Sequence, residues 1–313
     1  MPFEKVLVTG GAGFIGSHTV DALLKDGTSV WVLDDLSTGS LGNLRTWKKF
    51  KKFHFRHGST LRTNVVEALI QKVDAVIHLA AVVSPYYSVK KPKVVNEVNV
   101  TGTLNVLNAA LKAKTQRVVF ASSSSVYGDQ TLLPITEDNP LHPITPYGAS
   151  KLSGEKYCET YNRTYGLSTI SLRYFNAYGE RQRSNPYSGV IAIFSKQLKR
   201  GLRPKIFGDG SQTRDFIHVS DIVRANLQAL NAKASNAFNV GTGRPTSISE
   251  LSCLLARLAG RHDVSPEYTV TRTGDIHDSY ANVAKVREAL GFQAQVDLND
   301  GLEALLKWFA KKS

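Results

Sequence analysis

Short apolar runs alternate with helically spaced apolar residues along the first 240 residues of the chain. Continuous apolar runs of this length are typical of strands buried on both faces of a parallel sheet, and apolar residues three or four positions apart predict covering helices. We expect strands at 4–9, 29–33, 53–55, 75–79, 117–121, 168–172 and 237–240, and helices ending at 25 and spanning 64–71, 92–113, 147–165 and 221–230. This order predicts an α/β fold with a doubly wound parallel sheet.

The alternation becomes less regular after Arg173. The further elements that we expect are helices at 190–199, 248–259, 283–290 and 298–310, and strands at 205–207, 214–219 and 267–270. No repeat or flexible linker separates them from the sheet, so two lobes should interleave. The expected lobes are a larger one of 1–178 with about 213–242, and a smaller α/β lobe of 179–212 and 243–313. A cleft between them, at the carboxyl ends of the strands, is the default position for a site.

The turn after the first strand has the spacing of a dinucleotide-binding loop. Gly10 permits a tight turn, Gly13 lets the backbone approach a pyrophosphate, and Gly16 lets helix and strand pack closely. Asp34 ends the second strand 18 residues after Gly16, where its carboxylate can accept both ribose hydroxyls and would repel a 2′-phosphate. The stretch predicts a Rossmann-type lobe that prefers NAD to NADP.

A tyrosine and a lysine lie four residues apart at the start of the helix at 147–165. Tyr147 and Lys151 therefore project from the same face. A phenol has a pKa near ~10, and a nearby ammonium can lower that pKa by about 1–3, which makes the pair a proton acceptor for a sugar or alcohol hydroxyl. Such pairs are common by chance, but this one follows the glycine loop and a strand that ends in the serine cluster 122–125.

The net charge is +13, from 39 Lys and Arg against 26 Asp and Glu. Such an excess could reflect nucleic acid, an anionic surface or an anionic substrate. The densest basic run is 48–52, and its aromatic neighbours Trp47, Phe50 and Phe53 could stack on bases. We interpret the run as a short amphipathic helix that leads into a strand, with Phe50 buried and the lysines in solvent.

The remaining composition is ordinary for a globular protein, with 42% hydrophobic and 21% charged residues. No run approaches the ~20 apolar residues of a membrane span, and the chain enters a strand too early for a signal peptide. Cys158 and Cys253 both fall in helical patterns, where we expect small buried residues rather than a disulfide or metal ligands. We therefore expect a cytoplasmic protein with no metal and no membrane partner.

Over essentially its whole length, the chain resembles the extended short-chain dehydrogenase/reductases of the NAD-dependent epimerase/dehydratase family, and most of all the UDP-glucose (UDP-galactose) 4-epimerases. The matching segments are TGGAGFIGSH, LDDLSTG, HLAA, NVTGTLNVL, SSSSVYG, PYGASK, RYFNAYG, GDGSQTRDFIHV and TGDIHDS. They are specific for the superfamily and less so for the sugar. The resemblance implies an NAD-binding larger lobe, a UDP-sugar-binding smaller lobe, and a homodimer through a four-helix bundle of 92–113 and 147–165.

The resemblance also implies a reaction. Tyr147 matches the base for the sugar 4-hydroxyl, Lys151 the residue that holds the nicotinamide ribose and lowers the Tyr pKa, and Ser123 the hydroxyl that bonds the 4-oxygen, with Ser122 as the alternative. Hydride passes from C4 to NAD, the 4-keto sugar rotates about its link to the nucleotide, and the hydride returns to the other face of the sugar.

The remaining implied contacts divide between the two ligands. Those expected to bind NAD, besides Tyr147 and Lys151, are Gly10, Gly13, Phe14, Ile15, Gly16, Asp34, Asp35, Leu36, Ser37, Gly39, Leu79, Ala80, Ala81, Asn99, Ser122 and Tyr174. Those expected to bind the UDP-sugar are Ser84, Ser123, Tyr147, Asn176, Gln182, Val190, Phe207, Arg214, Arg272, Asp275 and Ser279. Arg214 and Arg272 match the two arginines on the pyrophosphate, Phe207 the uracil contact and Asp275 the uridine ribose contact.

Other chemistries on the same scaffold leave different signatures. Related 4,6-dehydratases and decarboxylases carry a carboxylate just before the VYG tyrosine, where this chain has Ser124 and Ser125, so we do not expect those reactions.

The choice of sugar stays open. Ser279 is small, as in relatives that accept N-acetylated sugars, and Gln182 and Gly189 also resemble that type, whereas Tyr86 and Tyr87 are bulky and could close the pocket from another side. UDP-glucuronate is a further alternative.

Two positions depart from the family, and one functional class can be set aside. Gly58-Ser59 replaces the usual Gly-Asp near the adenine, and Thr273 replaces the usual proline of the arginine motif. Relatives that only bind nucleic acid lose the tyrosine, the lysine or the glycines. All of these are intact here, so we do not expect nucleic acid as the partner.

Overall fold

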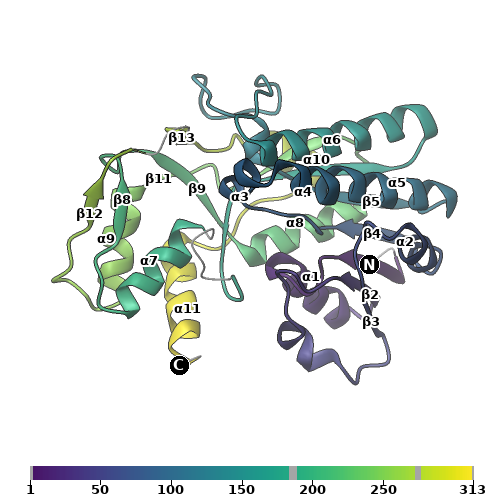
Figure 1. Ribbon diagram of the computed structural model, residues 1–313, viewed down its shortest axis with the longest axis horizontal. Coiled ribbons are helices and arrows are strands. Elements are labelled where there is room, and N and C mark those ends of the chain that lie inside the picture. Colours follow the sequence, from purple (N-terminus) through teal and green to yellow (C-terminus); the bar gives the residue numbers. More distant parts are fainter. Residues whose placement is uncertain (1–2, 183–188, 272–275, 312–313) are drawn as a thin grey trace.

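The computed structural model describes residues 3–182, 189–271 and 276–311. These residues form two lobes that share one continuous body (Figure 1). The larger lobe contains the parallel sheet and its helices, and the smaller lobe contains short strands and helices of its own. The predicted α/β fold with a Rossmann-type parallel sheet is confirmed.

Seven parallel strands form the sheet of the first lobe, in the order β10-β6-β5-β4-β1-β2-β3. Their bounds are β1 Lys5–Thr9, β2 Ser29–Asp34, β3 Phe53–His57, β4 Ala75–His78, β5 Arg117–Ser123, β6 Thr169–Tyr174 and β10 Ala237–Val240. The strand order reverses between β1 and β4. Ligands of such sheets bind beyond the carboxyl ends of the strands at this point.

Apolar helix faces cover both sides of the sheet (Figure 1). One side is covered by α1 (Phe14–Lys25), α8 (Val219–Asn231) and α10 (Ala284–Leu290), and the other by α2 (Thr63–Ile70), α5 (Gly102–Lys112) and α6 (Pro146–Tyr165). On α1, for example, Val20, Leu23 and Leu24 are buried because their spacing places them on one face.

The helix predicted at 92–113 is present but interrupted. A π-helical turn, η2 (Glu97–Thr101), joins α4 (Pro92–Asn96) to α5. A separate short helix, α3 (Pro85–Lys90), precedes α4, and the apolar pattern did not predict it. The π-helical turn matters for the site because it contains the buried Asn99.

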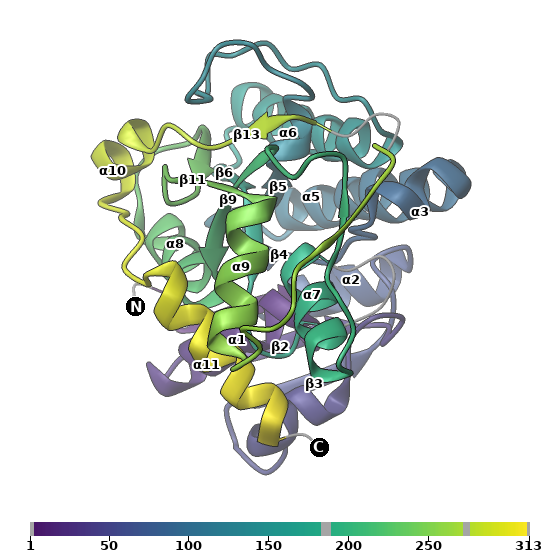
Figure 2. The same ribbon diagram turned by 90° about the vertical axis from the view of Figure 1, so that its left-hand side faces the viewer.

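The second lobe has two small sheets and its own core. Strand β9 (Thr213–His218) is central and pairs with β7 (Asn176–Tyr178), β11 (Pro245–Ser247) and β13 (Asp278–Ser279), while β8 (Lys205–Phe207) pairs with β12 (Glu267–Thr269). Figure 2 shows α7 (Val190–Lys199), α9 (Ile248–Leu258) and α11 (Leu298–Lys311) in front of these strands. Their apolar faces meet around Phe194, Leu251 and Leu302.

The two lobes exchange segments. Within 213–242, β9 belongs to the second-lobe sheet, whereas α8 and β10 belong to the first lobe. Helix α10, from the segment 243–313, packs against β10 through Val286 and Leu290 in the first-lobe core. The lobes therefore interleave, and we keep the predicted boundaries as a proposal.

The prediction for the basic run 48–52 was wrong in two respects. The helical turn, η1 (Leu41–Trp47), precedes the lysines, and Phe50 is 42% exposed. Trp47 takes the inward position instead, because its ring packs on the first-lobe core and its Nε1 donates to Asp21 at 2.6 Å. The four lysines of the run are exposed.

The two cysteines differ in burial, and both are free. Cys158 on α6 is buried as predicted, whereas Cys253 on α9 is exposed, which corrects the prediction for that residue. Among the described residues, no three His, Cys, Asp or Glu side chains come together in a way that would hold a metal ion. In the same residues, no helix has both the length and the hydrophobicity that crossing a membrane requires.

Candidate active site

The glycine loop lies at the carboxyl end of β1, at the point where the strand order reverses. Gly10 has a φ of +69°, and a Cβ there would lie 2.8 Å from the backbone nitrogen of Ala80. A Cβ on Gly16 would lie 2.1 Å from the carbonyl oxygen of Gly10. Gly13 is the N-cap of α1 and has no side chain to bond the first-turn amides of Phe14 and Ile15. A cradle of backbone amides at a helix N-terminus fits the pyrophosphate of a dinucleotide.

The carboxylate of Asp34 shapes the turn that follows β2. Its Oδ2 accepts from Ala12 N at 2.9 Å and its Oδ1 from Leu36 N at 2.8 Å, and burial raises its pKa. Asp35 accepts from the backbone and hydroxyl of Ser37. A Cβ on Gly39 would lie 2.7 Å from Asp34 Oδ1. The predicted residues of 34–39 are thus brought together next to the glycine loop, as a ribose site requires.

A buried hydrogen-bond chain fixes the end of β4. Thr103 Oγ1 donates to the carbonyl of Asn99, so it must accept from His78 Nε2, and His78 Nδ1 then accepts from Thr9 Oγ1 at 2.7 Å. Burial lowers the pKa of His78 to about 3, so this neutral tautomer persists at physiological pH. Thr9 Oγ1 also accepts from Ala80 N at 3.2 Å. The predicted contacts Leu79, Ala80 and Ala81 therefore follow a rigid strand end.

Asn99 holds the next loop in place. Its Oδ1 accepts from Val82 N at 2.7 Å, and its Nδ2 donates to Val82 O and to Ser150 Oγ. These bonds occupy the side chain, so Asn99 shapes the loop beside the expected cofactor site. The predicted sugar contact Ser84 lies in this loop as the N-cap of α3, with its hydroxyl accepting from Tyr87 N.

Tyr147, Lys151 and Ser123 meet where the N-terminus of α6 crosses the end of β5. Thr145 caps the helix, and Tyr147 and Lys151 follow on its inward face, 8% and 3% exposed. Lys151 Nζ donates to the carbonyl of Ala121 at 2.8 Å. The hydroxyl of Ser123 lies close enough to Tyr147 to lower its pKa. The structure brings the three predicted catalytic side chains together.

The expected pKa relation between Tyr147 and Lys151 was wrong for this arrangement. Burial raises the pKa of Tyr147, and the nearby hydroxyl of Ser123 opposes this rise only in part. Burial lowers the pKa of Lys151 to about 7, and its Nζ is directed at a backbone carbonyl. Desolvation therefore dominates both groups, and it moves the two pKa values apart, with that of the lysine below that of the tyrosine.

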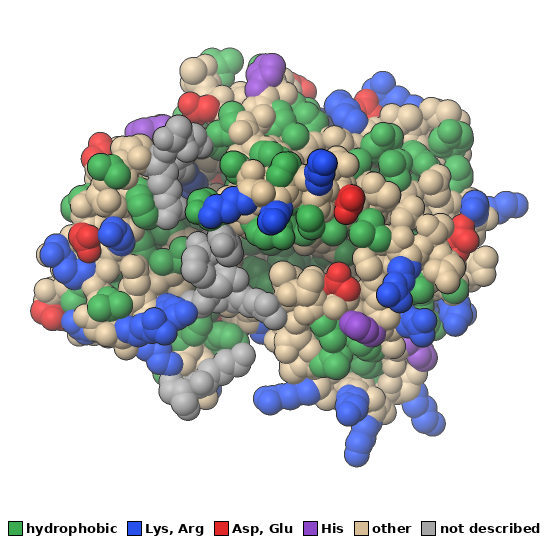
Figure 3. All heavy atoms as spheres, in the orientation of Figure 1, with side chains coloured by type: hydrophobic (Ala, Val, Ile, Leu, Met, Phe, Trp, Pro, Cys, Tyr) green, Lys and Arg blue, Asp and Glu red, His purple; other side chains and the backbone are tan. Residues whose placement is uncertain are grey.

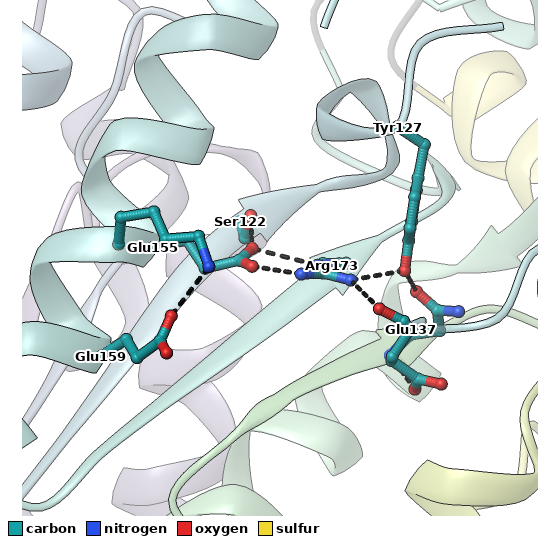
Figure 4. Close-up of polar contacts among 8 residues, drawn as sticks. Ser122, Tyr127, Glu137, Glu155, Glu159 and Arg173 are labelled. Atoms are coloured by element: carbon teal, nitrogen blue, oxygen red, sulfur yellow. Dashed lines mark hydrogen bonds and ion pairs between the residues drawn. The ribbon is translucent and has the colours of Figure 1, made fainter. Parts of the chain in front are cut away.

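A buried network of Ser122, Glu155, Arg173 and Tyr127 adjoins this site, because Ser122 precedes Ser123 on β5 and Glu155 follows Lys151 by one turn of α6. Figure 4 shows the contacts within the network. Ser122 Oγ donates to Glu155 Oε2 at 2.9 Å, and the Glu155 carboxylate accepts two bonds from Arg173, one of them at 3.1 Å. Arg173 Nη1 donates to Tyr127 Oη at 2.7 Å, and Tyr127 donates to Asn239. Burial alone would lower the pKa of Arg173, but the hydrogen bonds and charge of Glu155 raise it. We call these four residues the buried network.

The buried network separates the two candidate serines. Ser122 uses its hydroxyl to bond Glu155, whereas Ser123 is the serine whose hydroxyl lowers the pKa of Tyr147. Sequence reasoning missed Glu155 and Arg173. Glu155 lies four residues after Lys151 on the same inward face of α6, and a charged residue at a core position is a signal that could have identified it.

Several predicted UDP-sugar contacts lie on adjoining strands of the second lobe. Arg214 on β9 is the register partner of Ser279 on β13, and Asn176 on β7 pairs with Phe216, two residues along β9. Arg214 is fixed by bonds to the carbonyls of Thr213, Ile276 and His277. Near these strands, Figure 3 shows a hollow at the centre of the face, between the second lobe and the first.

Other predicted contacts are more dispersed. Gln182 bonds the carbonyl of Ala177, Val190 begins α7, and Phe207 ends β8 with its carbonyl bonded by Gln212. Tyr174 is buried and donates to Asn226 on α8, which places its ring in the first-lobe core. Arg272 and Asp275 lie outside the described residues.

The chain is similar to several known epimerases over almost its whole length. Residues 6–241 match the model of the NAD dependent epimerase/dehydratase family. The chain is 41% identical over 312 residues to the UDP-glucose 4-epimerase of Mycolicibacterium smegmatis, covering 99% of each. The structure of the UDP-glucose 4-epimerase from Thermotoga maritima with UDP-glucose is similar at 38% identity and a TM-score of 0.94, covering 98% of this chain and 99% of that one. The UDP-N-acetylglucosamine 4-epimerase from Methanobrevibacter ruminantium in complex with UDP-N-acetylmuramic acid is similar at 34% identity and a TM-score of 0.95, covering 99% of both.

Proposed function

The chain belongs to the NAD-dependent epimerase/dehydratase family of extended short-chain dehydrogenase/reductases, and we propose that it interconverts the C4 epimers of a UDP-hexose. The observation that carries the proposal is the meeting of Tyr147, Lys151 and Ser123 at the end of β5, beside a glycine loop that fits NAD. UDP-glucose and UDP-galactose are the substrates that we propose first.

The chain's own residues divide the chemistry between them. Ser123 holds the sugar 4-oxygen next to Tyr147, which takes the hydroxyl proton and later returns it. Lys151 is buried one turn further along α6, where it can hold the nicotinamide ribose. The bound NAD supplies the acceptor for the C4 hydride and gives that hydride back. The expected lowering of the Tyr147 pKa would then need positive charge beyond that of Lys151.

The serine cluster supports epimerisation over elimination. A 4,6-dehydratase needs a further carboxylate beside the ketone, and the adjacent positions are Ser124 and Ser125 in the turn η3 (Ser124–Val126). The hydroxyl oxygens of Ser123 and Ser125 lie 3.2 Å apart, and neither Ser124 nor Ser125 supplies that carboxylate. A hydroxyl with an ordinary pKa cannot transfer the proton that elimination requires.

N-acetylated sugars are the second candidate substrates. Ser279 is small and buried beside Arg214, and Tyr86 is 58% exposed with Lys90 over its ring at 4.6 Å. A bulky ring that faces solvent is a weaker barrier to an acetamido group than a buried one. This supports acceptance of UDP-GlcNAc and UDP-GalNAc alongside the unmodified pair.

We also propose a homodimer and a cytoplasmic location. A groove on α6, lined by Pro143, Ala149, Leu152 and Tyr157 among others, lies on the surface that the implied four-helix bundle would cover. Light scattering of the purified protein tests the dimer directly. Two free thiols, Cys158 and Cys253, are compatible with a reducing compartment.

The deciding experiment measures epimerisation by the purified protein with no NAD added. UDP-galactose and UDP-GalNAc are supplied in parallel, and Tyr147→Phe is the control. Turnover of both sugars by the wild type alone supports both substrate proposals, and turnover of UDP-galactose alone removes the second. If neither sugar turns over while NAD is bound, the proposal is wrong for these sugars, and UDP-glucuronate becomes the next substrate to test.

A further inference from the structure

The turn after β7 reaches from the second lobe to helix α1 of the first. Arg181 has a φ of +66°, and its Nη2 pairs with Asp21 Oδ2 at 2.6 Å. The carbonyl of Glu180 lies 2.9 Å from His18 Nε2. A carbonyl can only accept, so the histidine donates, and burial lowers the pKa of His18, which keeps the ring neutral. His18 and Asp21 lie three residues apart on α1, so the turn is fastened to this helix at two points.

The carboxylate of Asp21 also bonds a third segment. Its Oδ1 accepts from Trp47 Nε1 at 2.6 Å. Trp47 ends η1, and the other end of η1 is tied to the glycine loop, because Ser40 N and Asn43 Nδ2 both donate to the carbonyl of Ala12 at 2.9 Å. One carboxylate therefore joins the segment that follows the Asp34 turn to the turn that contains Arg181. We call Asp21, Trp47 and Arg181 the inter-lobe contact.

The inter-lobe contact connects the two expected ligands. The residues before η1, from Asp34 to Gly39, form the expected ribose site, and Gln182, next to Arg181, is an expected sugar contact. In the proposed reaction the C4 carbon gives a hydride to NAD and the C4 hydroxyl gives a proton to Tyr147, and the ketone must then recover both. Cofactor and sugar must therefore stay together until the second transfer is complete.

The geometry at Arg181 suggests more than a stabilising ion pair. The side chains of Arg181 and Asp21 are 23% and 19% exposed, and partly exposed pairs add little to folding stability. Arg181 also adopts a left-handed backbone conformation, and its Nη1 is buried without a hydrogen-bond partner within the described part of the chain. Local strain and an unpaired donor are more typical of functional positions than of positions selected for stability.

We infer that Asp21 and Arg181 are positioning residues that hold the cofactor segment and the substrate-side turn together, and thereby retain NAD through turnover. The retention of NAD stands on the geometry, and only its consequence for the sugar rests on the proposed function. The first readout is the rate at which NAD leaves the full-length protein after dilution, measured with no sugar present. Arg181→Ala should lose NAD about tenfold faster than the wild type, which corresponds to about 1.4 kcal/mol.

Matched variants distinguish the effect of losing the Arg181–Asp21 ion pair from the effect of disturbing the backbone or the fold. Arg181→Gly keeps the left-handed backbone while removing the side chain, and it should lose NAD as fast as Arg181→Ala. Arg181→Lys keeps the charge and should restore part of the retention. Trp47→Phe removes only the Nε1 donor and should give an intermediate rate. The control is Arg163→Ala, because Arg163 pairs with Glu159 on the same helix at 2.8 Å and spans no lobes. It should retain NAD like the wild type.

The second readout is escape of the 4-keto sugar. With UDP-galactose present, hydroxylamine captures any released ketone as an oxime, and Arg181→Ala should release about tenfold more oxime per turnover. NAD retention equal to the wild type in folded Arg181→Ala and Arg181→Gly would overturn the inference. Oxime in no variant and no epimerisation by the wild type would refute the proposed function instead, and the NAD-release result would still decide the inference.

Discussion

The buried network and the inter-lobe contact each pair one arginine with one carboxylate, but in opposite surroundings. Arg173 and Glu155 are both 5% exposed and are surrounded by further buried partners (Figure 4). Arg181 and Asp21 are about a fifth exposed, and they join segments 160 residues apart across the lobes. The first pair adjoins the residues proposed to perform the chemistry, and the second joins the parts expected to hold the two ligands.

The difference matches what the proposed reaction requires of each region. Proton transfer needs Tyr147 and Ser123 at fixed positions, because a displacement of about 1 Å can cost a hundredfold in rate. A buried, fully bonded network next to them provides that rigidity. The hexose must rotate between the two hydride transfers. The second lobe should therefore hold the nucleotide firmly and leave the hexose free to rotate.

The largest effect should come from removing the groups next to the buried network. Tyr147→Phe keeps the ring but removes the proton acceptor, so kcat should fall by about 10²–10⁴-fold. NAD content should stay unchanged, as measured by its absorbance after denaturation. Turnover by Tyr147→Phe within tenfold of the wild type would mean that another residue is the base.

Breaking each ion pair gives the second contrast. Glu155→Gln leaves Arg173 buried without a counter-charge, so the free energy of unfolding should drop by about 3–5 kcal/mol in urea titrations. Arg181→Ala should lose less than about 1 kcal/mol, because its pair is partly exposed. The double variant Glu155→Gln/Arg173→Met should recover part of the loss. Equal losses for the two single variants would remove the distinction between the two regions.

The neighbouring serines Ser122 and Ser123 should differ in the same way, one supporting stability and the other supporting catalysis, with smaller effects. Ser122→Ala removes one bond to Glu155, so unfolding should become easier by about 1 kcal/mol with kcat within a few-fold of the wild type. Ser123→Ala should instead lower kcat by about tenfold or more and change stability little. Steady-state kinetics and thermal unfolding of both variants test this division of roles between the two serines. The reverse pattern would make Ser122 the catalytic hydroxyl.

The smallest effect should be a pH dependence near the inter-lobe contact. The His218 ring, whose Nε2 lies 3.6 Å from Glu180 Oε2, holds the pKa of Glu180 at about 2 against an opposing effect of burial. A carboxyl whose pKa is lower in the folded protein stabilises it above the unfolded pKa, and this contribution disappears as the pH falls from about 4.5 towards 2. The stability difference between the wild type and Glu180→Gln should therefore shrink across that range. A difference that stays constant with pH would exclude Glu180 as its source.

The sequence predicts the first lobe well because its signals are local. Strands β1, β2, β4, β5 and β6 are buried on both faces and read as apolar runs, and the glycine loop, Asp34 and the Tyr147 helix follow recognisable spacings. The prediction failed at two places in this lobe, the buried aromatic position near the basic run and the helix at 92–113. Trp47 rather than Phe50 fills the inward position, and a π-helical turn within 92–113 has no periodic signature.

The two ion pairs were not predictable from local pattern. Glu155 and Arg173 lie 18 residues apart on a helix and a strand, and Asp21 and Arg181 lie 160 apart. Their pairing depends on how the sheet and the lobes bring distant segments together. The pKa of Tyr147 was mispredicted for a related reason, because spacing reveals the neighbouring lysine but not the depth of burial that outweighs it.

The central claim is that NAD and the sugar both stay bound while the 4-keto sugar rotates between the two hydride transfers. An isotope crossover experiment tests it most directly. UDP-galactose with deuterium at C4 is mixed with uniformly ¹³C-labelled UDP-galactose, and the UDP-glucose formed is analysed by mass spectrometry. The account predicts that deuterium remains at C4 of the ¹²C molecules. Deuterium in ¹³C product, or its loss to water, would contradict the account.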